Sequence, residues 1–276
     1  MYSIYHFFKS LVTNKTSFLK IKKLDGFPFE LGMLASISVG KFPDMAIRLN
    51  KDKTVFTGGE LIELKDSISY SVSSFNSTIP SKSKQISKII TSENNSIFKQ
   101  MEDAGNNIYS LPQRDVFYLI RGRKANHTKV CLVSGAFFET IRKEELISES
   151  FMQVLDDNLK ESDNKIAPEI RNLFHKIFSE QENFSKVRNV DKASVKLRFR
   201  IMTEVKAEGN ILNSKNYPEI EDDTLNFIIP CESKDDEDNI LSKFNFVFNK
   251  KERQQFKIFK LKHHFNGYFF VFQINH

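Results

Sequence analysis

Two short runs of the sequence place acidic and basic side chains where they can share one site. Pro43-Asp44 comes first, and Glu63-Leu64-Lys65 follows after a Gly58-Gly59 pair. Side chains alternate between the two faces of a strand, so the first and third residues of the second run project from the same face. A hairpin across the glycine pair would bring the Asp44 carboxylate beside Glu63. The sequence therefore predicts two carboxylates and one ammonium at the edge of a small sheet.

This trio suits metal-dependent hydrolysis of a phosphodiester. The carboxylate oxygens of Asp44 and Glu63 are ligands that Mg²⁺ prefers, and the backbone carbonyl of Leu64 is well placed as a further ligand. Mg²⁺ polarises a phosphate and lowers the pKa of a bound water, which gives a nucleophile at neutral pH. The ammonium of Lys65 orients that water or stabilises charge that develops on the phosphate. We therefore predict Asp44, Glu63 and Lys65 as catalytic residues and Mg²⁺ as the cofactor.

Two competing interpretations of these residues stay open. A bare Glu-x-Lys pattern on a surface strand also forms a solvated pair with no catalytic role. Glu60 is a competing acid, but the alternation of the strand places it on the face opposite Glu63.

The surrounding segments resemble the catalytic stretch of type II restriction endonucleases of the PD-(D/E)xK superfamily. The similarity covers about residues 40–90, in FPDMAIRLN, GGELIELKDS and SFNSTIPSKSK, and is closest over Pro43–Lys65. It implies metal binding by Asp44 and Glu63 with a catalytic Lys65. Because such enzymes often add a Glu from an upstream helix, the resemblance also implies Glu30 as a metal ligand.

Short polar side chains and cations that follow the second run are predicted to contact DNA. Such groups suit phosphates, which position a duplex without reading its sequence. Two arginines of the next strand are predicted to read bases, because Arg hydrogen-bonds guanine in the major groove. The alternative is an ordinary polar loop or a solvated strand face. The predicted DNA-binding residues are Ser73, Asn76, Ser77, Lys82, Lys84, Arg121 and Arg123.

The composition of the chain agrees with a nucleic-acid partner without requiring one. The formal net charge is +6 over 276 residues, and a basic balance favours polyanions such as double-stranded DNA. Cys131 and Cys231 match no zinc-binding spacing, and we expect reduced core cysteines. We see neither an apolar run long enough to span a membrane nor a signal peptide, so we expect a cytoplasmic protein without membrane contact.

The elements that must position the trio predict an α/β (α+β) fold. We expect a restriction-endonuclease-like core, a central mixed sheet flanked by helices, with a β-rich C-terminal part. The predicted domains are a catalytic core over 1–140, a helical segment over 141–192 and the β-rich part over 193–276. Helical spacing is seen over 4–23, 84–101, 144–159 and 168–178. Strands are predicted at 45–49, 61–64, 116–120, 129–134, 195–201, 225–230, 244–248, 256–264 and 268–274, with an acidic loop at 232–238.

The function predicted from the sequence is that of a type II restriction endonuclease. Such an enzyme hydrolyses double-stranded DNA at a specific site, which we expect to be palindromic. A homodimer matches that symmetry and presents one catalytic centre to each strand. One alternative is a repair, junction-resolving or mobile-element nuclease of the same fold. An alternative of another class is a non-catalytic DNA-binding protein. We expect the C-terminal part to contact DNA or to form the dimer interface.

Overall fold

The computed structural model describes the chain in several ranges, which belong to two compact units. The units are Met1–Glu139 with Thr203–His276, and Thr140–Met202. In the second unit, the described residues are helical pieces at 152–153, 156–157, 168–170 and 172–173, inside the two helices predicted there. In the first unit, the described residues are 2–14, 34–35, 42–49, 58–67, 81–89, 96–103, 109–124, 126–138 and 212–275. The predicted strand at 195–201 lies outside the described residues.

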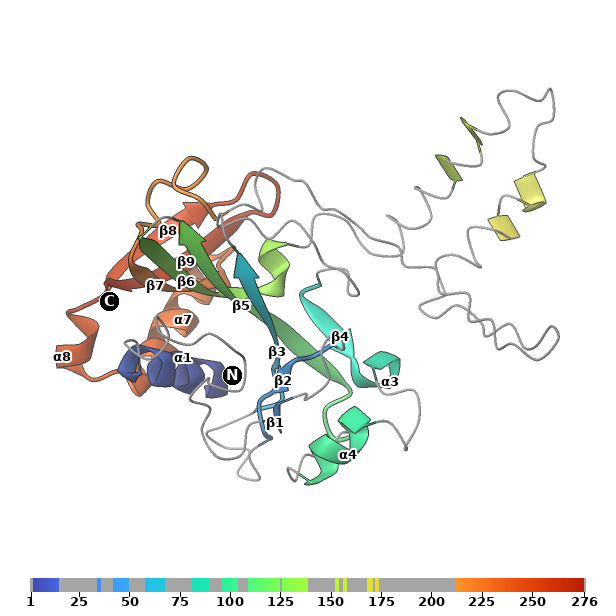
Figure 1. Cartoon of the computed structure of the whole chain (residues 1–276), viewed down its shortest axis with the longest axis horizontal. Helices are drawn as coiled ribbons and strands as arrows, with labels where there is room; N and C mark the ends of the chain where they lie inside the picture. Colours follow the sequence, from blue (N-terminus) through green and yellow to red (C-terminus); the bar gives the residue numbers. More distant parts are fainter. Residues whose placement is uncertain are drawn as a thin grey trace. The chain divides into compact units, whose positions relative to one another are not determined.

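A mixed β-sheet forms the centre of the first unit (Figure 1). Its strand order in the described residues is β1-β2-β3-β5-β6-β7-β9-β8, and β4 pairs with β5. The pairs β3/β5 and β6/β7 are parallel, and the other pairs are antiparallel. The strands are β1 (Leu34–Ala35), β2 (Met45–Ala46), β3 (Leu61–Ser67), β4 (Ser83–Gln85), β5 (Gln113–Lys124), β6 (His127–Ser134), β7 (Thr224–Pro230), β8 (Lys257–Lys262) and β9 (Tyr268–Asn275).

This arrangement confirms a mixed α/β fold with a central sheet flanked by helices. The last three strands, β7, β8 and β9, follow residue 193 in the chain, yet they continue the sheet begun by β1 to β6. The parallel pairing of β6 with β7 joins the two parts, with Leu132 opposite Phe227. The catalytic core and the β-rich part predicted from the sequence therefore share one sheet.

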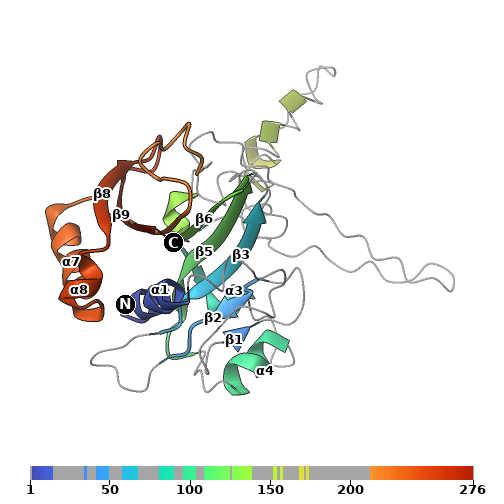
Figure 2. The same cartoon turned by 60° about the vertical axis from the view of Figure 1, so that its left-hand side comes forward.

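Helices cover the sheet on both faces, and each face has its own apolar core. The α1 face is covered by α1 (Ser3–Thr13) and α7 (Lys234–Val247), which lie side by side in Figures 1 and 2. The α4 face is covered by α3 (Ile86–Ile89), α4 (Ser96–Asp103) and the 3-10 helix η2 (Gly135–Phe137). A further short helix, α8 (Lys250–Arg253), follows α7. No helix within the described ranges is long and apolar enough to cross a membrane.

The side chains of β3 alternate between the two faces of the sheet. Leu61 packs in the core of the α4 face, whereas Ile62 packs in the core of the α1 face together with the partly buried Leu64. Glu63 and Lys65 therefore belong to the α4 face, and Asp66 belongs to the α1 face.

One predicted strand is wrong: residues 244–248 form the end of α7 and its C-cap. Of the residues predicted as an acidic loop at 232–238, those from Lys234 onward form the start of that same helix. Ser233 caps the helix in a capping box with Asp236, and three acidic residues in the first turn suit its positive end. Ile240, Phe244 and Val247 are buried on one side of the helix, a helical spacing that a short apolar run did not reveal.

Candidate active site

The pairing of β2 with β3 brings Asp44 to the second run. The two strands are antiparallel, with Met45 opposite Ile62, as the hairpin expectation requires. The pairing extends past β2, because Ile47 donates its N–H to the Glu60 carbonyl at 2.8 Å. Asp44 lies just before β2, and its Oδ2 accepts the backbone N–H of Leu64 at 2.8 Å. This hydrogen bond fixes the Asp44 carboxylate beside β3.

The glycine pair is needed to start β3 in this position. Gly59 has a φ of 95°, a left-handed conformation that favours glycine. A Cβ on Gly58 would lie only 1.8 Å from the Arg48 carbonyl oxygen, so a side chain there would collide with backbone. The backbone N–H of Gly59 reaches the Ile47 carbonyl at 2.7 Å. The two glycines thus allow the close approach that sets the register between Asp44 and Glu63.

Glu63 and Lys65 form an ion pair on the α4 face. The Lys65 ammonium lies 2.8 Å from Glu63 Oε1, and the side chains are 23% and 12% exposed. The other oxygen of the same carboxylate, Oε2, is buried without a hydrogen-bond partner in the described part of the chain. The Asp44 and Glu63 carboxyl groups lie within hydrogen-bonding reach of one another if a proton is shared between them. Two acidic groups and one ammonium therefore converge here.

Burial raises the pKa of both acids. The pKa of Glu63 rises to about 7 because of desolvation, which the charge of Lys65 opposes and that of Asp44 reinforces. Desolvation also raises the pKa of Asp44, against the Leu64 N–H and the charge of Lys65. Two neighbouring carboxylates resist ionising together unless a proton or a cation lies between them. The raised pKa of Glu63 thus reflects both its burial and its acidic neighbour.

The backbone carbonyl of Leu64 is a further oxygen at the same edge. If the register of β2 and β3 continues by two residues, Pro43 stands opposite Leu64. A proline nitrogen carries no hydrogen, so it cannot donate the ladder hydrogen bond that this carbonyl would otherwise accept. The oxygen atoms at this edge that could bind a metal are therefore those of two carboxylates and one carbonyl, all hard ligands. Among the described residues, no group of three or more His, Cys, Asp or Glu side chains is gathered to hold a metal.

The competing acid Glu60 belongs to the opposite face, as the alternation of the strand predicts. Ser3 of α1 donates its hydroxyl hydrogen to the Glu60 carboxylate, with both oxygens 2.8 Å away. Glu60 is buried, and its pKa rises to about 7 by desolvation, which the Ser3 hydroxyl opposes. Its contact with α1 gives Glu60 a place in the packing of that helix, away from Glu63.

The predicted DNA-binding residues that the structure describes lie on different faces of the sheet. Arg121 and Arg123 project on the α1 face, where both pair with Asp66 at 3.0 and 2.8 Å. Lys84 lies on β4, with its ammonium 5.4 Å from the ring centre of Phe42, which packs against the core of the α4 face. The structure therefore does not gather these basic residues around one carboxylate pair. Glu30, Ser73, Asn76 and Ser77 lie outside the described residues, and Lys82 immediately precedes β4.

Two buried polar residues of β5 were not among the predicted site residues. Tyr118 of β5 stands directly opposite Glu63 in the parallel register and is 1% exposed. Arg114 is also 1% exposed, and its Nη1 and Nη2 have no hydrogen-bond partner within the described ranges. Burial lowers the pKa of Arg114 to about 10, against the charge of Glu60. The pairing of β3 with β5, which sequence spacing cannot give, brings Tyr118 beside Glu63, whereas Arg114 lies near Gly59 and Glu60.

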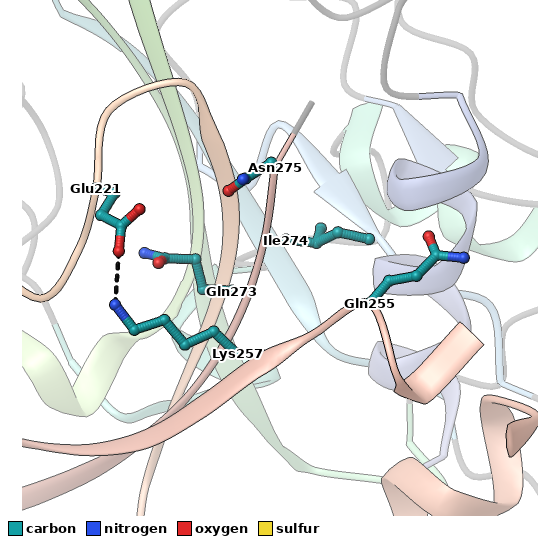
Figure 3. A pocket seen from close by; sticks show the side chains of 6 residues that line it. All are labelled: Glu221, Gln255, Lys257, Gln273, Ile274 and Asn275. Carbon is teal, nitrogen blue, oxygen red and sulfur yellow. Dashed lines mark hydrogen bonds and ion pairs between the residues drawn. The ribbon is translucent and has the colours of Figure 1, made fainter. Parts of the chain in front are cut away.

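A separate hollow of about 340 Å³ lies at the far edge of the sheet (Figure 3). Lys257 and Glu221 form an ion pair of 2.6 Å at its rim, and the amide of Gln273 points toward them. Lys257 stands in the same cross-strand row as Lys65, but five strand spacings away, which is roughly 24 Å. The remaining lining residues are Gln255, Ile274 and Asn275. Because one carboxylate and neutral amides line this hollow, it lacks the paired acids of the β2/β3 edge.

Comparison with protein-family models, with curated proteins and with solved structures gives no match to this chain. The geometry of Asp44, Glu63 and Lys65 is therefore the basis for a functional proposal.

Proposed function

We propose that this protein is a Mg²⁺-dependent endonuclease of the PD-(D/E)xK type that cleaves double-stranded DNA at a specific, palindromic site. The observation that carries the proposal is the meeting of Asp44 and Glu63 beside Lys65 at the edge of β3. Its strongest support is the buried Glu63 Oε2, for which the described part of the chain offers no hydrogen-bond partner. A structural ion pair alone would not require a second carboxylate against the first.

The oxygen donors at this edge fit a hydrated Mg²⁺ ion. Asp44 and Glu63 would supply carboxylate oxygens and Leu64 its backbone carbonyl, while waters and a substrate phosphate complete the coordination. Sites with one or two carboxylates and several waters are typical of Mg²⁺ next to phosphates. When bound, the ion supplies polarisation of the phosphate and a water of lowered pKa.

The protein's own residues divide the remaining work. The Leu64 N–H holds the Asp44 carboxylate in place, so little reorganisation is needed when the substrate arrives. The Lys65 ammonium, paired with Glu63 through one of its three N–H donors, has others to orient a water or to stabilise negative charge on the phosphate. Lys84, whose ammonium lies over the ring of Phe42, would contact a neighbouring phosphate.

The proposal includes a restriction-endonuclease-like core and double-stranded DNA as the partner. A mixed sheet with helices on both faces is compatible with a restriction-endonuclease-like core, and the net charge of +6 favours a polyanion. We propose a homodimer, because two-fold symmetry places one catalytic centre on each strand of a palindrome. A repair, junction-resolving or mobile-element nuclease would use the same three residues and would differ in its DNA substrate.

The test is Mg²⁺-dependent cleavage of phage DNA by the purified protein. Wild-type protein should give discrete fragments with Mg²⁺ and none with EDTA. Asp44→Asn should lower the cleavage rate at least about a hundredfold, the scale of removing one preorganised electrostatic group. Its thermal unfolding should stay close to wild type, because the change removes one of two like charges.

A matched control and the possible outcomes make this test decisive. Asp238→Asn removes a carboxylate of similar size from the exposed start of α7, where Asp238 pairs with Lys234 at 3.4 Å, and should leave cleavage unchanged. Wild-type turnover in Asp44→Asn would remove Asp44 from the site. DNA binding without any Mg²⁺-dependent nicking would instead indicate a non-catalytic DNA-binding protein. Cleavage only of branched or single-stranded substrates would indicate the repair or junction-resolving alternative.

A further inference from the structure

A compact charged cluster lies on the α1 face, one residue beyond Lys65. It consists of Asp66, Arg121 and Arg123, and is called the Asp66 cluster. Arg121 binds Asp66 through two hydrogen bonds, from Nε to Oδ1 at 3.2 Å and from Nη2 to Oδ2 at 3.0 Å. Arg123 donates from Nη2 to Oδ2 of the same carboxylate at 2.8 Å. One acidic group thus holds two guanidinium groups, which leaves the cluster with a net charge of one positive.

The two arginines differ in exposure. The Arg121 side chain is 9% exposed, whereas that of Arg123 is 54% and that of Asp66 is 42% exposed. A guanidinium carries five N–H donors in a planar fork that fits carboxylate and phosphate oxygens equally well. Arg123 uses one nitrogen for Asp66, so much of its fork faces solvent. The exposed N–H groups of Arg123 can therefore bind an anionic group from solvent, in competition with the Asp66 carboxylate.

The cluster is adjacent to the proposed active site through the strand itself. Asp66 stands opposite Arg121 in the β3/β5 register, and β3 ends one residue later at Ser67. Successive strand residues are about 3.3 Å apart, so Lys65 and Asp66 project from the two faces of the same strand end. A polyanion that crosses this end of β3 can touch Lys65 on one face and Arg123 on the other.

We propose that the Asp66 cluster is a second contact for the DNA backbone, in which the Asp66 carboxylate competes with phosphate for the Arg121 and Arg123 guanidinium groups. The inference takes its partner from the proposed function. Asp66 then limits non-specific affinity: a phosphate must displace a carboxylate that is already bound. Removal of Asp66 adds one positive charge and releases both forks, so DNA binding becomes tighter and more dependent on salt.

The experiment measures binding of a short fluorescein-labelled DNA duplex by anisotropy, with EDTA present, over a series of NaCl concentrations. Asp66→Asn should bind several-fold more tightly than wild type, with a salt dependence steeper by about one counterion. Adding Arg123→Gln to Asp66→Asn should weaken binding again and return the slope toward wild type. Glu221→Gln is the matched control, since Glu221 forms an exposed ion pair of 2.6 Å with Lys257 at the opposite edge of the sheet. That variant adds the same charge and should leave both affinity and slope at the wild-type values.

Each result decides the inference separately from the proposed function. Equal tightening in Asp66→Asn and Glu221→Gln would overturn it, because the effect would then be one of total charge. Unchanged or weaker binding in Asp66→Asn would overturn it too, and would leave the cluster as a structural ion pair. Cleavage assays with Mg²⁺ are read independently. If Asp66→Asn does not tighten DNA binding while the wild-type protein still cleaves DNA, only this inference is refuted. A tightened Asp66→Asn in a protein that never cleaves DNA refutes the nuclease proposal only.

Discussion

Two groups of polar side chains lie on the α4 face of the sheet, and they differ in charge and in hydrogen bonding. At the β2/β3 edge, Asp44 and Glu63 are like-charged neighbours, and one buried oxygen of Glu63 has no hydrogen-bond partner among the described residues. On β7 and β9, Asn226 and Gln273 are neutral, and their amide groups are hydrogen-bonded. Gln273 Nε2 donates to Asn226 Oδ1 at 3.0 Å, and Asn226 Nδ2 donates to Thr224 Oγ1 at 2.9 Å.

The difference predicts which substitutions should change activity and which should change stability. A buried polar network whose members are all paired rigidifies a core, whereas a partly satisfied one is costly and persists where it serves function. The C-terminal group has its hydrogen bonds made inside the sheet, whereas the N-terminal group carries the proposed chemistry. Substitutions in the C-terminal half should therefore lower stability, and substitutions at the β2/β3 edge should lower activity with little loss of stability.

The largest expected loss of stability comes from the aromatic core beneath α7. Phe244 is fully buried and stacks on Phe272 with ring centres 4.1 Å apart. Phe244→Ala should reduce the free energy of unfolding by about 3–5 kcal/mol, through lost burial and the cavity left behind. Phe246→Ala is the control on the same helix, because Phe246 is 60% exposed, and it should cost below about 1 kcal/mol. Equal losses in urea denaturation would contradict the packing described for α7.

A smaller effect tests the comparison directly. Asn226→Ala removes the acceptor of the Gln273 amide inside a fully buried site and should cost about 1–3 kcal/mol. Glu63→Gln should be neutral or stabilising in metal-free protein at neutral pH, because it removes one charge from a repelling pair. Urea denaturation of both variants in EDTA checks the contrast. A large loss of stability in Glu63→Gln would mean that the Glu63–Lys65 ion pair is a structural element.

The arrangement of the trio could be predicted because it depends on local rules. Strand alternation put Glu63 and Lys65 on one face and Glu60 on the other, and the glycine pair indicated the turn that brings Asp44 close. Both expectations agree with the geometry of β2 and β3. They follow from a period of two along a single strand and from one antiparallel neighbour.

What could not be predicted depends on pairing between distant segments. The parallel register of β3 with β5 places Arg121 opposite Asp66, on the face away from Glu63. No spacing within either strand contains that information. The helix α7 was missed for another reason: its apolar residues are few and begin after an acidic turn. The Ser233 to Asp236 capping box was the available signal, and it outweighs the acidic composition that indicated a loop.

The smallest and most specific effect is a change in how stability depends on pH. The pKa of Glu63 rises from its ordinary value of 4.5 to about 7 in the folded protein, mainly by desolvation. Between these values the folded state binds more protons than the unfolded state, so stability falls as pH rises through this window and then levels off. A single such group changes stability by roughly 1 kcal/mol per pH unit within the window. Glu60 contributes in the same direction, since its pKa is also raised to about 7, and its part remains in Glu63→Gln.

The measurement compares thermal or urea unfolding of wild type and Glu63→Gln from pH 4.5 to 7, with EDTA and with Mg²⁺. In EDTA, wild type should lose more stability than the variant as pH rises, because only wild type must ionise Glu63 beside Asp44. With Mg²⁺ the wild-type loss should shrink, since a cation between the carboxylates replaces the shared proton. The variant should respond less to Mg²⁺, because it lacks one carboxylate ligand. Parallel curves for the two proteins in EDTA would mean that Glu63 ionises without cost. The buried oxygen of Glu63 would then be solvated in solution, and the contrast with the satisfied Asn226–Gln273 group would no longer hold.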